Sequence, residues 1–70
     1  MHRQHDWLPV LGQEVQIKLD GSVVRTGLVD GVTNDGAIIW IAAHGATPRA
    51  MFERARGFSV WIDYKWDSSG

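Results

Sequence analysis

The stretch that decides the fold covers residues 13–32 and reads QEVQIKLDGSVVRTGLVDGV. Its first half alternates, with apolar side chains at positions 15, 17 and 19 and polar side chains between them. A period of two is that of a strand with one buried face. The pair Asp20-Gly21 follows directly, and such a pair supplies the positive φ angles of a two-residue hairpin turn. The stretch therefore predicts two antiparallel strands joined by a tight turn.

The second strand, residues 22–32, is long and contains Gly27 and Gly31. Glycine inside a strand marks a bulge or a bend, so we expect this strand to curl the sheet over itself. The turn signal Asn-Asp-Gly follows at residues 34–36, and the apolar run AIIWIA at residues 37–42 predicts a buried central strand.

The chain changes character after this strand. Residues 49–55, RAMFERA, are rich in helix formers, and Thr47 before Pro48 is typical of an N-cap followed by proline in the first helical position. We expect a short helical turn that ends before Gly57, with a loop or a weak strand in residues 44–48. Apolar residues then alternate with polar ones and Trp61 from Phe58 onward, which predicts a final strand.

This order predicts an all-β small barrel of about five strands, with a strongly bent second strand and one short helical turn before the last strand. The barrel is expected at residues 13–66, after an N-terminal extension at residues 1–12 and before a disordered tail at residues 67–70. Both ends are expected to fray. The apolar part of the extension would lie over a barrel mouth or on a partner, and Trp7 and Trp66 could meet as a staple between the two ends.

The chain resembles the SH3-like small barrels, the broad group that includes Sm-like, Tudor and KOW modules. The resemblance rests on three features: the alternating strand at residues 14–19, the bent strand at residues 25–32, and the helical turn before the last strand. It is topological and covers roughly residues 13–64. It implies a module that binds peptides, RNA or sister subunits rather than one that catalyses a reaction.

Composition limits the other possibilities. The 70 residues allow one domain, and the absence of cysteine excludes disulfides and thiol nucleophiles and removes the best zinc ligands. No apolar run is long enough for a membrane helix, and no signal-peptide hydrophobic region follows Met1, so we expect a cytoplasmic protein. A core this small is thin, which makes a homo-oligomer plausible.

Trp40 and Trp61 are the sharpest candidates for a binding surface. Both indoles point outward if Ile39 and Ile41 face the core on one strand and Phe58, Val60 and Ile62 face it on the other. Exposed tryptophan could stack on bases, hold a proline-rich peptide or bury against a second subunit, or one indole could simply cover the edge of the core. The predicted interface consists of Trp40, Met51, Phe52, Trp61 and Trp66.

Arginine forms the only local basic cluster, at Arg49, Arg54 and Arg56, to which Arg25 could be joined. Arginine near an exposed aromatic ring is typical of a nucleic-acid surface. The formal net charge of −1 does not favour that role, because nucleic-acid binders usually carry a basic excess. The competing interpretation is a solvated surface whose arginines pair with nearby acids.

Histidine gives weaker leads. His2, His5 and Asp6 could bind a divalent cation if their segment were ordered, although a frayed tail is the simpler interpretation. His44 lies in a loop and could act as a general base, but no serine stands in a known nucleophile motif. Catalysis would need an oligomer that gathers His44 loops around a central pore. We therefore assign no catalytic, cofactor or metal residues.

The sequence predicts a non-enzymatic interaction module that self-associates through outward-facing aromatic side chains. The alternative is an RNA- or DNA-binding module of Sm-like or KOW-like type, which would use tryptophan to stack on bases and arginine to hold phosphates.

Overall fold

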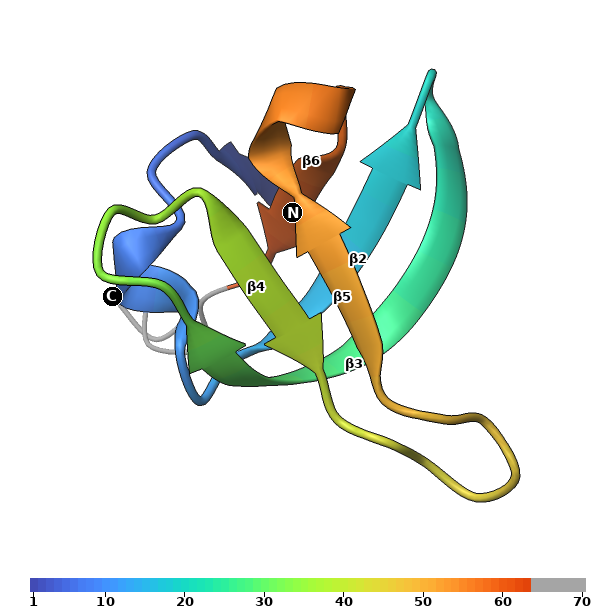
Figure 1. Cartoon of the computed structure of the whole chain (residues 1–70). Coiled ribbons are helices and arrows are strands. Elements are labelled where there is room, and N and C mark those ends of the chain that lie inside the picture. Colours follow the sequence, from blue (N-terminus) through green and yellow to red (C-terminus); the bar gives the residue numbers. More distant parts are fainter. Residues whose placement is uncertain (64–70) are drawn as a thin grey trace, which may run out of the picture.

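Residues 1–63 are described by the computed structural model, and they form one antiparallel sheet with two short 3-10 turns (Figure 1). The sheet runs in the order β1-β6-β2-β3-β4-β5. The all-β prediction is confirmed, but the sheet has six strands where about five were expected. The elements are β1 (His2–Gln4), η1 (Leu8–Val10), β2 (Glu14–Leu19), β3 (Ser22–Val32), β4 (Ile38–Ile41), β5 (Ala50–Glu53), η2 (Arg54–Arg56) and β6 (Ser59–Ile62).

The long strand β3 shapes the sheet. Its first residues pair with β2 and its last residues pair with β4, and in Figure 1 it arcs between the two halves of the molecule. Gly27, with φ of 151°, lies on the inside of the bend, where an added Cβ would be 2.8 Å from Cγ2 of Ile41. Within residues 1–63 no ladder joins β1 to β5, so the curled sheet is open rather than a closed barrel.

The hairpin between β2 and β3 has the predicted form. Asp20 and Gly21 both adopt positive φ, 51° and 82°, as a two-residue turn between twisted strands requires. The register pairs Leu19 with Ser22 directly across this turn. The bounds of β2 and β3 also agree with the strands predicted from the alternating pattern.

The core lies between the two halves of the curled sheet. Alternation places every second residue of β2, β4 and β6 inside, because successive side chains of a strand point to opposite faces. β3 contributes one buried residue to this core, Val29, and the N-terminal segment contributes two, Trp7 and Val10. The buried hydrophobic side chains are Trp7, Val10, Val15, Ile17, Val29, Ile39, Ile41, Val60 and Ile62.

The N-terminal segment is part of the sheet and of the core, so the expectation that it frays is wrong. Residues 2–4 form the edge strand β1, which pairs with β6. Trp7 is only 1% exposed, and η1 places Val10 in the same cluster. The predicted staple between Trp7 and Trp66 involves a residue outside the described part of the chain, but the Trp7 indole itself fills the core.

The segment predicted as helical is divided. Ala50–Glu53 form β5, and the helical turn expected before the last strand is confined to Arg54–Arg56, where it ends at Gly57 with φ of 94°. Strand pairing with β4 prevails over helix propensity here because it packs Phe52 against the core. The weak strand considered for residues 44–48 is a single bridge between His44 and Thr47. No helix in residues 1–63 has the length and apolar character needed to cross a bilayer.

Candidate interaction surface

Trp40 lies on the outer face of β4, opposite the core. Its neighbours Ile39 and Ile41 are fully buried, so the predicted register of this strand is confirmed. Trp40 pairs with Gly31 on β3 and with Met51 on β5. An added Cβ at Gly31 would lie 3.1 Å from Cε3 of Trp40, which shows that the indole packs directly on the glycine backbone.

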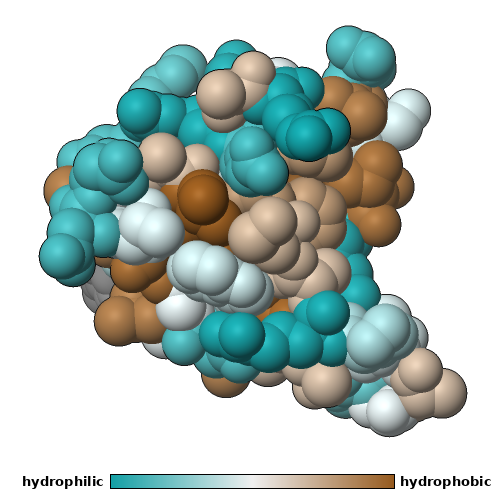
Figure 2. All heavy atoms as spheres, in the orientation of Figure 1, coloured by the Kyte–Doolittle hydropathy of each residue, from teal (hydrophilic) through white to brown (hydrophobic). Residues whose placement is uncertain are grey.

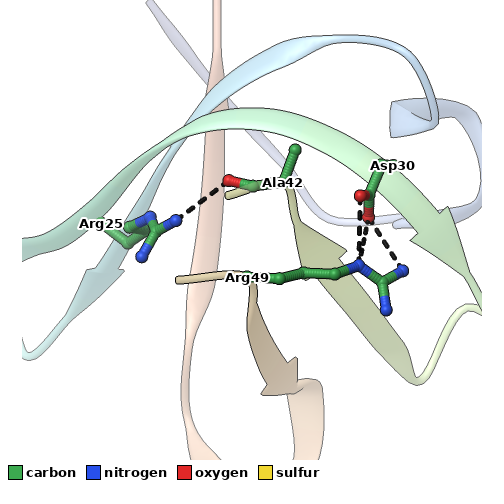
Figure 3. Close-up of polar contacts among 4 residues, drawn as sticks. All are labelled: Arg25, Asp30, Ala42 and Arg49. Atoms are coloured by element: carbon green, nitrogen blue, oxygen red, sulfur yellow. Dashed lines mark hydrogen bonds and ion pairs between the residues drawn. The ribbon is translucent and has the colours of Figure 1, made fainter. Parts of the chain in front are cut away.

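Arg49 also lies against this indole, and an added Cβ at Gly31 would be 3.1 Å from its Nη2 as well. Its Cζ atom lies 5.4 Å from the centre of the Trp40 ring. The guanidinium is held there by Asp30, with Nε donating to Oδ1 and Oδ2 at 3.0 and 3.1 Å and Nη2 lying 2.9 Å from Oδ1 (Figure 3). Asp30 is the extra residue at the point where the β3–β4 register shifts between Val29 and Gly31. The bulge thus aims the carboxylate at the arginine.

Arg25 secures the loop that carries Arg49. Its Nη2 donates to the carbonyl oxygen of Ala42 at 3.0 Å, drawn in Figure 3, and to that of Pro48 at 2.9 Å. These two carbonyls stand at the beginning and at the end of the loop between β4 and β5. Arg25 on β3 thus ties both ends of this loop to the sheet through its Nη2.

The outer surface of β4 and β5, which we call the β4–β5 face, consists of Trp40, Arg49, Met51 and Glu53. Met51 is 51% exposed and lies opposite Trp40 in the register. Figure 2 shows this side of the molecule, where hydrophobic residues gather near the middle and hydrophilic residues lie around them. The face therefore combines an apolar centre with a charged residue at each end of β5.

Trp61 lies on the outer face of the other half of the sheet. It pairs with Arg3 of β1 on one side and with Gln16 of β2 on the other. The Nζ atom of Lys18 lies 4.1 Å from the centre of its ring, and its Nε1 donates to Oγ of Ser59 at 2.9 Å. Both outward tryptophans are thus half-buried beneath a cation.

The structure separates the residues that the sequence grouped together. Of the predicted interface residues, it joins Trp40 and Met51, places Trp61 on a different face, and turns Phe52 toward the core, where it meets Phe58 edge to face at 5.0 Å. Phe52 is therefore not part of the candidate surface. Trp66 lies outside the described residues.

The predicted basic cluster is also divided. Arg49 lies beside the Ile41 end of the β4–β5 hairpin, whereas Arg54 and Arg56 lie on η2, beyond its Ile38 end. Arg49 is paired with Asp30, and Nε of Arg56 lies 3.6 Å from Oε2 of Glu53. These arginines do not form one continuous basic patch.

The sequence analysis did not single out two basic residues beside Trp61, namely Arg3 and Lys18. The alternation that predicted β2 placed Lys18 on its outer face. Its contact with Trp61 requires the pairing of β2 with β6, which no local pattern reveals. Arg3 lies in a strand too short to produce a periodic signal.

A hollow of about 350 Å³ lies between β2, β3 and the loop after β4. Glu14, Thr26 and His44 lie on it, and His44 exchanges backbone hydrogen bonds with Thr47. Residues 1–63 contain no group of three acidic, histidine or cysteine side chains placed to hold a metal ion. Asp6, which the sequence analysis considered for a divalent cation but did not assign, accepts a hydrogen bond from the backbone of Leu8 at 3.0 Å.

Comparison with protein-family models, with curated proteins and with solved structures finds no match to this chain.

Proposed function

We infer that the chain is a non-enzymatic interaction module that associates with copies of itself through the β4–β5 face. The fold is interpreted as an open variant of the SH3-like small barrel. This interpretation is supported by the bent β3, shared between the two halves of the sheet, and by the 3-10 turn that connects β5 to β6.

One observation carries the proposal: a half-exposed methionine on an edge strand lies beside an outward indole on the neighbouring strand. Met51 is the cross-strand partner of Trp40, and β5 ends the sheet within residues 1–63. Aromatic and methionine side chains are enriched at protein interfaces, where an apolar centre is bordered by polar groups. Arg49 and Glu53 provide such a border at the two ends of β5.

The experiment measures molar mass by light scattering after size exclusion, across a range of concentrations. Met51→Ser should raise the dissociation constant about tenfold or more, because each copy loses the apolar area that its methionine buries. Val23→Ser is the matched control, since Val23 is 50% exposed and Met51 is 51% exposed. Equal effects of the two variants would contradict an interface on the β4–β5 face.

Binding of single-stranded RNA or DNA is the second candidate, and the geometry around Trp61 favours it. Lys18 covers the ring, Arg3 pairs with the same residue, and Gln16 continues the row on β2. Nucleic-acid surfaces combine aromatic rings with cations in this way.

Salt separates the two candidates. Phosphate contacts weaken steeply as ionic strength rises, whereas burial of apolar area does not. Lys18→Ala should abolish binding to a mixed single-stranded pool and leave self-association unchanged. Arg54→Ala tests an arginine singled out by the sequence in the same way, whereas Arg49→Ala is read for nucleic-acid binding alone because Arg49 borders the β4–β5 face. Binding that resists both salt and these substitutions would exclude a nucleic-acid role.

A further inference from the structure

The free edge of β5 is defined by its hydrogen-bond pattern with β4. The backbone N–H of Arg54 donates to the carbonyl of Ala37 at 2.8 Å, and this pair continues the register in which Ile38 opposes Glu53. Hydrogen-bonded and non-hydrogen-bonded pairs alternate along an antiparallel ladder. The backbone groups of Ala50 and Phe52 therefore bond to β4. Those of residues 49, 51 and 53 point away from it.

These outward backbone groups have no strand beside them in residues 1–63, because β5 is the last strand in the sheet order. An edge strand with free N–H and C=O groups is a template for one more strand. The side chains of the same three residues, Arg49, Met51 and Glu53, share the outer face with Trp40, since alternate residues of a strand point to one side.

The sequence of this edge is self-complementary in charge. When two copies of β5 run antiparallel with Met51 opposite Met51, Arg49 of each copy lies opposite Glu53 of the other. The three residues whose backbone groups point outward are also the three that oppose one another in this register. Opposite charges directly across an antiparallel pair are stabilising, and like charges are destabilising.

We propose that two copies of this chain join edge to edge along β5, in antiparallel register, with a twofold axis passing between the two Met51 residues. The proposal rests on the self-association inferred above and specifies its geometry. Met51 of each copy exchanges both backbone hydrogen bonds with Met51 of the other. The row Gly31, Trp40 and Met51 then continues across the axis into the same row of the second copy, so that one apolar stripe crosses the dimer.

The register is tested by cysteine pairing, because the chain has no cysteine of its own. In Met51→Cys the two thiols stand on a hydrogen-bonded pair with Cα atoms about 5.5 Å apart, inside the range that a disulfide spans. This variant should form a covalent dimer under mild oxidation. Glu53→Cys alone should not, since its counterpart lies four residues away, roughly 13 Å along the strand. A mixture of Arg49→Cys and Glu53→Cys should link the two variants to each other.

Charge exchange provides a second test that does not depend on oxidation. Arg49→Glu and Glu53→Arg each place like charges across both ends of the pair, so each variant alone should associate about tenfold more weakly. An equimolar mixture should recover the native association, because every acidic residue of one copy then opposes an arginine of the other. Circular dichroism of each variant checks that the fold is kept.

The outcomes separate this inference from the proposed function. A native chain that stays monomeric at every concentration overturns both. The native chain could instead associate while the Met51→Cys variant forms no covalent dimer and the charge variants do not recover association on mixing. That result would overturn the β5 register and leave self-association standing. Covalent dimers of Met51→Cys, together with preferential linking of Arg49→Cys to Glu53→Cys, support the inference.

Discussion

The Cζ atom of Arg49 lies 5.4 Å from the centre of the Trp40 ring, so the guanidinium covers part of the outward indole. The other half of the sheet repeats this arrangement, with Lys18 4.1 Å from the centre of the Trp61 ring. A cation above an aromatic ring is attracted by the ring's quadrupole and shields the ring from water. Both outward tryptophans are therefore kept half-buried by a neighbouring strand or loop.

Asp30→Ala should loosen this cover at Trp40. The guanidinium of Arg49 loses its bidentate partner, so the indole becomes more accessible to solvent. Unfolding free energy should fall by less than about 1 kcal/mol, because the ion pair is exposed. Glu14→Ala on β2 is the control, and the Nε1–H resonance of Trp40 in NMR spectra is the readout. A Trp40 resonance that is unchanged in Asp30→Ala would show that Arg49 holds its place without the carboxylate.

Gly27→Ala should destabilise the bend of β3. The new methyl would lie 2.8 Å from Cγ2 of Ile41, and φ at this position is 151°, which alanine adopts only with strain. We expect a loss of about 1–3 kcal/mol in urea unfolding. Gly12→Ala is the control, since it also has positive φ but open space around the added Cβ. If both variants lost the same unfolding free energy, the whole effect would come from the positive φ, and the contact between the new methyl and Ile41 would contribute nothing.

Trp7→Ala should remove the largest side chain from the core. Deletion of a buried aromatic costs about 3–5 kcal/mol, a large share of the stability of a domain this small. Leu8→Ala is the neighbouring control, because Leu8 is 49% exposed and should cost less than about 1 kcal/mol. Urea unfolding followed by circular dichroism measures both variants. Similar midpoints would mean that the N-terminal segment does not contribute to the core in solution.

The turn between β3 and β4 should contribute a pH-dependent stability. The hydroxyl of Thr33 and the N–H of Ala37 donate to the Asp35 carboxylate at 2.8 and 3.1 Å. These hydrogen bonds, that of Thr33 first, hold the pKa of Asp35 below its ordinary value of 3.8. Its contribution is therefore complete above that value and is lost as pH falls through the lower pKa of the folded state.

Thr33→Val tests this dependence. The pKa of Asp35 should rise toward its ordinary value in an NMR titration, while Ser22→Ala should not move it. Native and Asp35→Asn chains should differ in stability at neutral pH and converge in acid, below the folded pKa. A difference in unfolding free energy that stays constant down to that pH would contradict the assigned role of the carboxylate.

Local patterns were sufficient to predict the central strands. The alternation around Val15 and Ile17 fixed which face of β2 is buried, and Asp20-Gly21 fixed the hairpin. In both cases the information lies within a few residues of the chain, where side-chain period and turn chemistry act. The outward directions of Trp40 and Trp61 were expected only on the condition that their apolar neighbours face the core, because apolar residues occupy both faces of the run at residues 37–42.

The rest depends on contacts between distant segments. β1 is three residues long and is held by β6, and β5 has the composition of a helix but is held by β4. The cover over Trp61 comes from Lys18 on β2, which lies far earlier in the chain. These features depend on strand pairing across long sequence separations, and no local signal encodes that pairing.

The molar mass of the native chain as a function of its concentration tests the central claim most directly. Light scattering should give a mass that rises from 7.8 kDa toward twice that value, at low and at moderate salt alike, and Met51→Ser should hold the mass near 7.8 kDa. A mass of 7.8 kDa at every concentration and salt level would contradict self-association through the β4–β5 face.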